Sequence, residues 1–131
     1  MRVDSMVGTE FDWMAVDGDG RLGLFSTAGL GPVPEAALEH QSEHAAIVNL
    51  VAKLGGLPAW ADLLSFCGNV PVFVYDWEHW SGPYRRAQIP AKGGSLKLSD
   101  LPEDLRTFVV RLDLSFEESL EVLPSQLGLV G

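Results

Sequence analysis

Two histidines and a glutamate are spaced so that they could hold a zinc ion. His40 and His44 are four residues apart, and Glu43 directly precedes the second histidine. On a helix, residues four apart lie one turn above each other, so two imidazoles can bind one Zn²⁺ while the glutamate activates a bound water. The spacing therefore predicts a hydrolytic site in which Glu43 is the base.

A catalytic zinc ion needs a third protein ligand, which must come from another part of the chain. The candidates are three carboxylates far along the sequence, Glu117, Glu118 and Glu121. The pattern from His40 to His44 resembles the H-x-x-E-H signature of inverzincin metallopeptidases, and this resemblance implies a downstream glutamate at a separation similar to that of Glu121. Those enzymes are large and two-halved, whereas the resemblance covers five residues. The commoner alternative is that these side chains form the solvated face of an amphipathic helix.

A second group of residues has the composition of a protein interface. Three aromatic rings, several charges and an imidazole occur within residues 76–86. Trp, Tyr and Arg bury a large area per side chain while keeping a polar group, and they dominate binding hot spots. The predicted binding residues are Asp76, Trp77, Glu78, Trp80, Tyr84, Arg85 and Arg86. In the alternative, Trp77 and Tyr84 belong to the core and only residues 78–82 are exposed.

The charge balance indicates what kind of partner such a surface would meet. Eighteen Asp and Glu against nine Lys and Arg leave a formal charge of -9. This charge would repel a phosphate backbone, so we exclude nucleic-acid binding. The same field would speed encounter with a basic protein. The locally basic region is formed by Arg85, Arg86, Lys92 and Lys97, and it could fix the orientation of a partner.

Turn and strand signals predict how these residues are positioned. Residues 11–16 alternate and predict a strand, Asp17-Gly18-Asp19-Gly20 predicts a turn, and residues 21–27 predict the returning strand. The same four residues begin like a calcium-binding EF-hand loop, but Arg21, Leu22 and Ala28 stand where that loop needs its other ligands and glycine. We therefore expect a hairpin and no calcium.

The rest of the chain predicts one long helix and further strands. Apolar spacing over residues 35–54, ended by Gly55-Gly56, predicts a helix whose first half protrudes and whose second half is buried. Further strands are expected at residues 70–77, 84–89, 108–117 and 120–123. We expect the strand at 70–77 to be central in the sheet, and the segment 108–117 has the clearest alternation. Short helical turns are expected at 59–66 and, from a capping box, at 101–105, and a tail after 124. Hairpin connections favour an α+β domain over residues 1–131, with a mostly antiparallel sheet and one long helix on one face.

The first hairpin and the turn after it also resemble a group of known sequences. The residues involved are 11–20, 24–29 and 32–34, in which Phe11-Asp12-Trp13, Leu24-Phe25 and Pro32-Val33-Pro34 stand out. They resemble the opening of small uncharacterised bacterial proteins, some of which are thought to be immunity proteins of toxin systems. The resemblance implies a cytoplasmic, non-enzymatic domain that blocks a cognate toxin, and it carries no functional residues.

These observations favour a cytoplasmic protein-binding domain without a cofactor, which binds a basic partner protein and no nucleic acid or membrane. Cys67 is the only cysteine, so the chain cannot form an internal disulfide, and the first residues lack the apolar stretch of a signal peptide. The alternative function is a small zinc-dependent hydrolase that uses His40, His44 and Glu121.

Overall fold

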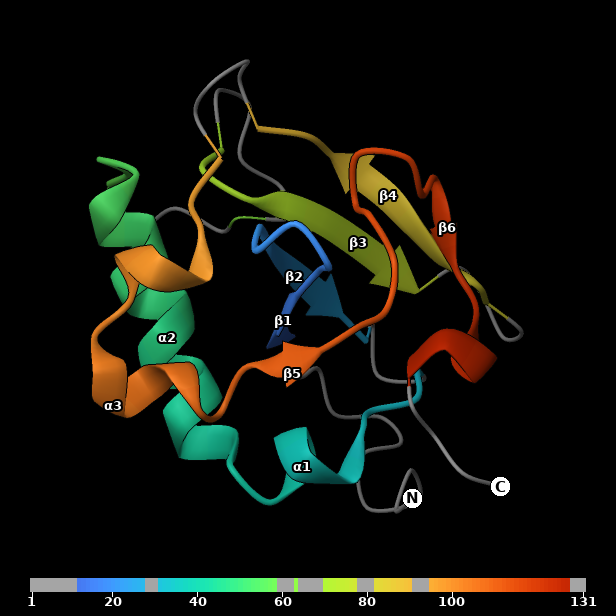
Figure 1. Cartoon of the computed structure of the whole chain (residues 1–131), viewed down its shortest axis with the longest axis horizontal. Coiled ribbons are helices and arrows are strands. Elements are labelled where there is room, and N and C mark those ends of the chain that lie inside the picture. The colour runs from blue at the N-terminus through green and yellow to red at the C-terminus, as the bar shows by residue number, and fades with distance from the viewer. Residues whose placement is uncertain are drawn as a thin grey trace.

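The computed structural model describes residues 12–27, 31–58, 63, 70–77, 82–90 and 95–127 of the chain (Figure 1). The strands are β1 (Asp12–Val16), β2 (Leu22–Ser26), β3 (Phe73–Trp77), β4 (Tyr84–Gln88), β5 (Val110–Arg111) and β6 (Glu121–Val122). The α-helices are α1 (Glu35–Leu38), α2 (Gln41–Leu54) and α3 (Glu103–Arg106), and the short 3₁₀ helices are η2 (Leu98–Asp100) and η3 (Pro124–Leu127).

The six strands form one curled sheet in the order β5-β1-β2-β3-β4-β6. The pairs β1–β2, β3–β4 and β4–β6 are antiparallel, whereas β1–β5 and β2–β3 are parallel. The predicted α+β class with a mostly antiparallel sheet is therefore confirmed. The two parallel pairs arise because the chain between the paired strands passes through helices, and such a crossover can bring the next strand back in the same direction.

The predicted hairpin of β1 and β2 is confirmed, and its turn explains the acidic residues between the strands. One carboxylate oxygen of Asp17 accepts hydrogen bonds from the backbone N–H groups of Asp19 and Arg21, at 3.0 and 2.9 Å. Gly20 has a φ of 82°, a left-handed conformation that glycine adopts without strain. These residues build a turn, as the sequence indicated.

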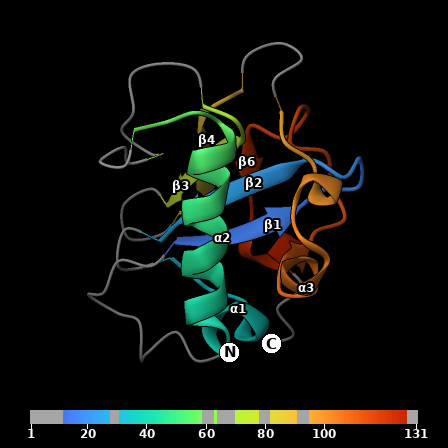
Figure 2. The same cartoon turned by 90° about the vertical axis from the view of Figure 1, so that its left-hand side faces the viewer.

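Two hydrophobic clusters lie on opposite faces of the sheet. Alternation along β3 separates them, because Phe73, Tyr75 and Trp77 face one cluster while Val72 and Val74 face the other. The first cluster, here called the aromatic core, consists mainly of Trp13, Phe25, Tyr75, Trp77, Tyr84, Leu112, Phe116, Val122 and Leu127. The second lies under α2, which packs against β1 and crosses in front of the sheet in Figure 2. The central position predicted for β3 is thus confirmed.

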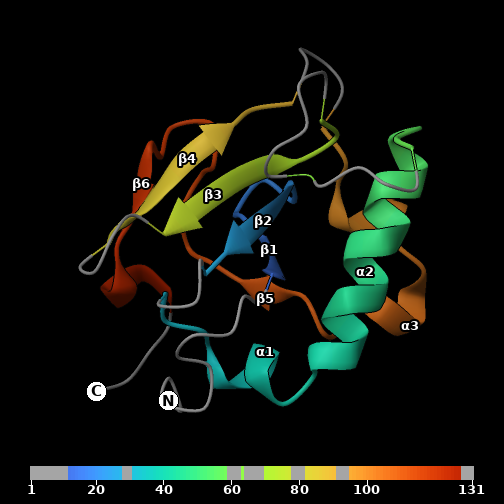
Figure 3. The ribbon, with the colours of Figure 1, turned by 180° about the vertical axis from the view of Figure 1, so that it is seen from behind.

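The prediction of a single helix over residues 35–54 is wrong, since α1 and α2 are separate helices joined at Glu39 and His40 (Figure 3). His40 has φ -128° and ψ 46°, outside the helical region. Ala37 and Leu38 of α1 belong to the aromatic core, whereas Ile47 and Val51 of α2 belong to the other cluster. Half of α1 is therefore buried, although Glu35 and Ala36 remain exposed, and the break lets the two helices pack on different faces of the sheet.

The predicted strand over residues 108–117 is also wrong, because only Val110 and Arg111 pair with the sheet. Beyond them the chain turns across the open side of the aromatic core, into which Leu112 and Phe116 point. Apolar residues at alternate positions can belong to such an irregular segment when each is buried from a different direction. The ring of Phe116 lies over Gly23, where a Cβ atom would come within 2.7 Å of it.

Three smaller expectations have mixed outcomes. The strand at 120–123 is confirmed as β6, and the tail after it contains η3, with Leu127 buried. The helical turn at 101–105 begins two residues late, at Glu103 after Pro102, and the Asp100 carboxylate accepts a hydrogen bond from the backbone of Lys97 instead. The helical turn at 59–66 lies outside the described residues, apart from Leu63.

Candidate functional site

The structure buries the second histidine of the predicted zinc pair. His44 is 0% exposed, and its Nδ1 atom accepts a hydrogen bond from the backbone N–H of Met14 on β1, at 2.9 Å. The pKa of His44 is lowered to about 4, mainly by burial and in smaller part by the charge of His40, while the Phe108 backbone and the charge of Glu43 act in the opposite direction. Its Nδ1 lone pair thus holds the helix to the sheet.

The first histidine lies where the helix begins, on the surface of the same junction. His40 occupies the N-cap position of α2, and its ring packs against Phe108 with the centroids 4.8 Å apart. The Nδ1 atom of His40 is 3.3 Å from a carboxylate oxygen of Glu43. The side chain of Glu43 is therefore occupied with a neighbouring ring.

The proposed third ligands have other partners or lie elsewhere. Glu117 forms an ion pair with Arg21, and Glu121, on the edge strand β6, forms one with Arg85 at 3.1 Å. Glu118 is exposed, in a turn in which its backbone N–H binds the Ser115 carbonyl. Within the part of the chain that the structure describes, no three His, Cys, Asp or Glu side chains are grouped so that they could hold a metal ion. The structure does not bring His40, His44 and Glu121 together.

The structure places two of the predicted interface aromatics in the core. Trp77 and Tyr84 face each other across β3 and β4, with ring centroids 5.0 Å apart in an edge-to-face arrangement. The Tyr84 hydroxyl donates to the Pro32 carbonyl at 2.9 Å and accepts from the indole N–H of Trp13 at 3.3 Å. Burial raises the pKa of Tyr84 well above its usual value. These two side chains therefore follow the core alternative, and they stabilise the strands on either side of the predicted loop.

The charged members of the same group remain at or near the surface. Arg85 is exposed and lies opposite the half-buried Asp76 in the β3–β4 ladder. Arg86 is half-buried, and its guanidinium donates to the backbone carbonyls of Phe116 and Glu117, at 2.8 and 2.9 Å. Glu78, Trp80 and Lys92 lie outside the described residues, so their part in the predicted surface stays a prediction.

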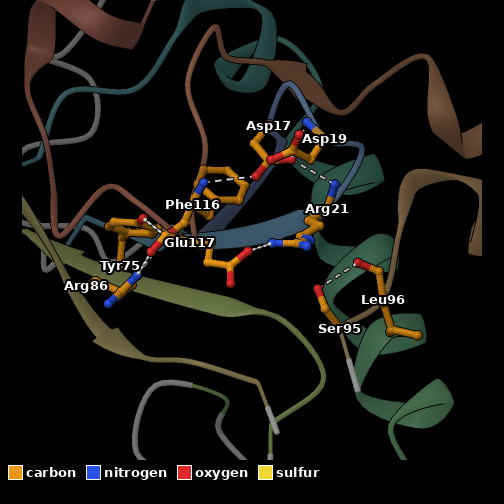
Figure 4. A network of polar contacts seen from close by, with 9 residues as sticks. All are labelled: Asp17, Asp19, Arg21, Tyr75, Arg86, Ser95, Leu96, Phe116 and Glu117. Carbon is orange, nitrogen blue, oxygen red and sulfur yellow. Dashed lines mark hydrogen bonds and ion pairs between the residues drawn. The ribbon is translucent and has the colours of Figure 1, made fainter. Parts of the chain in front are cut away.

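An acidic surface that the sequence did not indicate lies where the β1–β2 turn meets the segment after β5 (Figure 4). The second carboxylate oxygen of Asp17 accepts a hydrogen bond from the Phe116 N–H at 2.9 Å, and the Gly18 N–H donates to the Leu114 carbonyl at 2.9 Å. These bonds join the turn that carries Asp19 to the segment that carries Asp113, Glu117 and Glu118, and all four of these acidic residues are exposed. We call these four residues the acidic rim.

One arginine lies within the acidic rim. The guanidinium of Arg21 donates a hydrogen bond to Glu117, and this bond, together with the charges of Glu117, Asp19 and Asp17, raises the pKa of Arg21 above its usual value. Three carboxylates therefore share one cation, and this part of the surface keeps a negative charge. Only the acidic residues of the turn were visible in the sequence, because Arg21 and Glu117 are 96 positions apart.

Comparisons with known proteins identify no relative. No family model, no curated protein and no solved structure matches the chain. In the described part of the chain, no helix has the length and apolar character needed to cross a membrane.

Proposed function

We propose that this chain is a non-enzymatic protein-binding domain for a basic protein, and that it acts as an immunity-type inhibitor of that protein. The observation that carries the proposal is the excess of surface carboxylate. The chain has eighteen acidic and nine basic residues, and several of the basic side chains already have partners within the protein. Arg21 and Arg85 are held in ion pairs, and Arg86 binds backbone carbonyls.

The acidic rim is the part of this surface best suited to a basic partner. Glu117 keeps 67% of its side chain exposed despite its contact with Arg21. The segment that carries the rim is held from below by Asp17, which binds the Phe116 N–H, and by Tyr75 and Arg86, which bind the Phe116 carbonyl. A surface that is already ordered loses less entropy on binding than a mobile one. Opposite charges also speed encounter with a basic protein.

The predicted loop between β3 and β4 supplies a second contact in this proposal. Asp76 and Arg85 flank it on the described strands, and Trp80 lies within it. A Trp side chain at a contact buries a large area and is often a hot spot. Replacing Trp80 by alanine is therefore expected to weaken any complex that forms.

The first test is co-expression of the tagged full chain with the product of a neighbouring gene, followed by affinity capture at low and moderate salt. We expect a basic protein to be retained, with an affinity that falls as ionic strength rises, since exposed charges are screened over about 10 Å at 0.1 M salt. Failure to retain any specific protein at low salt would remove the support for this function.

The second test distinguishes the acidic rim from the overall charge. The variant Asp113→Lys/Glu118→Lys reverses two rim charges, and the control Glu35→Lys/Glu39→Lys makes the same change of charge at exposed positions of α1 and its C-cap. We expect the rim variant to weaken binding about tenfold or more, equal to about 1.4 kcal/mol, and the control to weaken it much less. Equal weakening by both would contradict a docking site at the rim.

A further inference from the structure

His44 joins three segments of the chain at one buried point. Its ring extends from the first turns of α2, its Nδ1 atom accepts the Met14 N–H of β1, and the backbone of Phe108, in the segment just before β5, is close enough to raise the pKa of the ring. A backbone amide can only donate through its nitrogen, so Nδ1 must carry no proton. The ring is therefore neutral, with its single proton on Nε2.

The ring replaces a missing strand partner of β1. On the side away from β2, β1 pairs with β5 only at Ala15 and Val16. Met14 is the residue before these two pairs, where a longer β5 would continue the ladder. There the Met14 N–H donates its hydrogen bond to His44 instead of to a strand. A buried amide without an acceptor is costly, so this side chain completes the hydrogen bonding of the sheet edge.

We propose that His44 is an acid-sensitive latch, and that a proton added to its Nδ1 atom breaks the bond to Met14 and frees the start of α2 from the sheet. The proton comes from solvent, and the product is an imidazolium whose two ring nitrogens both carry hydrogen. The N–H of Met14 then faces another N–H, and a positive charge lies in an apolar cluster. The opposed N–H groups and the buried charge are both relieved when the ring moves out of its buried position.

The charges around the latch come from its own helix. His40 opposes protonation of the ring, whereas Glu43 favours it, and the two side chains contact each other at the surface. Burial outweighs both and lowers the pKa of His44 to about 4. The latch therefore responds below neutral pH, with its midpoint set by burial.

The two elements packed against the ring contact it through backbone groups. The charged residues of these two elements are Asp12 on β1 and, before and after Phe108 in the sequence, Arg106 and Arg111. The Arg106 side chain is directed at the carbonyls of Leu101 and Ser99, at 2.8 and 3.0 Å.

The opening is local because few side chains hold the start of α2. The helix buries His44, Ile47 and Val51, and the two apolar residues lie one and two turns further along. The aromatic core on the opposite face contains none of these three residues. Loss of the His44 contacts thus loosens the first turns of α2 and its junction with β1, while β3 and β4 remain packed.

Native-state hydrogen exchange of the full chain, followed by NMR between pH 7 and pH 4, tests the latch. The protection factor of the Met14 amide should fall up to about tenfold per pH unit below about pH 6.5, and about 100-fold between pH 7 and pH 4, because the ring protonates more easily when it is exposed than when it is buried. The Tyr75 amide on β3 exchanges when the whole fold opens, so at each pH it should be better protected than the Met14 amide and depend more steeply on low concentrations of urea. Equal protection and equal urea dependence at the two amides, or constant protection at Met14, would overturn the proposal.

Two variants separate the latch from general acid unfolding. In His44→Asn the amide oxygen lies near the position of Nδ1 and can accept the Met14 N–H, but it does not titrate, so the pH-dependent loss of protection at Met14 should disappear. The matched control His40→Asn removes the neighbouring ring and should keep the loss. If His44→Asn retains it, the proposal is wrong. Should that variant not fold, the ¹⁵N shifts of the wild-type ring decide, because a proton on Nδ1 at pH 7 contradicts the latch.

Discussion

Replacing Asp17 by alanine should destabilise the fold more than any other single change in the β1–β2 turn. Asp17 is 6% exposed, and its carboxylate accepts three backbone hydrogen bonds, from Asp19, Arg21 and Phe116. The first two link residues of the turn, where water can replace the lost acceptor. The Phe116 amide is buried, and it joins the turn to a segment 99 residues away. The carboxylate therefore holds the acidic rim to the sheet.

The expected loss follows from these three bonds. A hydrogen bond to a charged group contributes about 1.5 to 3 kcal/mol, and a buried donor left without a partner costs about 1 to 3 kcal/mol. Counting the buried bond in full and the two solvated ones in small part gives about 3 to 4 kcal/mol for Asp17→Ala. Asp17→Asn keeps one acceptor oxygen for the turn and should lose about half as much.

Urea unfolding, followed by tryptophan fluorescence and circular dichroism, measures this loss. The free energies of the variants can be compared if the free energy of unfolding falls with urea concentration at the same slope in each of them. Asp19→Ala is the matched control, because Asp19 is an exposed carboxylate in the same turn, and it should change the free energy of unfolding by less than about 0.5 kcal/mol. A loss below 1 kcal/mol for Asp17→Ala would refute the argument that Asp17 anchors the distant segment.

Four further predictions concern the core and the buried histidine. Phe116→Ala should lower the free energy of unfolding in urea by about 3 to 5 kcal/mol, since it leaves a cavity in the aromatic core. Gly23→Ala should cost about 1 to 3 kcal/mol in the same assay, because the new methyl group would meet the Phe116 ring at 2.7 Å. Tyr84→Phe removes the donor to the Pro32 carbonyl and should cost about 1 to 3 kcal/mol, with no change in the far-UV spectrum. For His44, whose folded pKa of about 4 lies below the ordinary 6.5, stability is fully present above pH 6.5 and falls by about 3 kcal/mol as the pH drops to 4, which urea titrations at several pH values should show relative to His44→Asn.

Much of the sheet could be predicted because its sequence signals are local. The turn residues between β1 and β2 and the alternation along β3 report directly on a hairpin and on two buried faces. The prediction over residues 108–117 was wrong for the same reason, since alternation alone cannot distinguish a strand from a segment whose side chains point into the core from outside the ladder. Leu112 and Phe116 are buried, but only Val110 and Arg111 pair with β1.

The helix break and the candidate site depended on contacts that no local pattern reports. The apolar spacing continues from Leu38 to Ile47, although these residues pack on opposite faces of the sheet. The zinc hypothesis assumed an uninterrupted helix, whereas His40 caps α2 and His44 points at β1. In the same way, Trp77 and Tyr84 have interface composition, but pairing across two strands places them in the core.

The segment that closes the aromatic core has a consequence for how the chain folds during synthesis. When translation has passed β4, the aromatic face of β1, β2 and β3 still lacks Leu112, Phe116, Val122 and Leu127. The nascent sheet then exposes a row of large rings to solvent and to other chains, a situation that favours aggregation or capture by chaperones. Folding yield in the cell should accordingly depend on how quickly the ribosome releases this late segment.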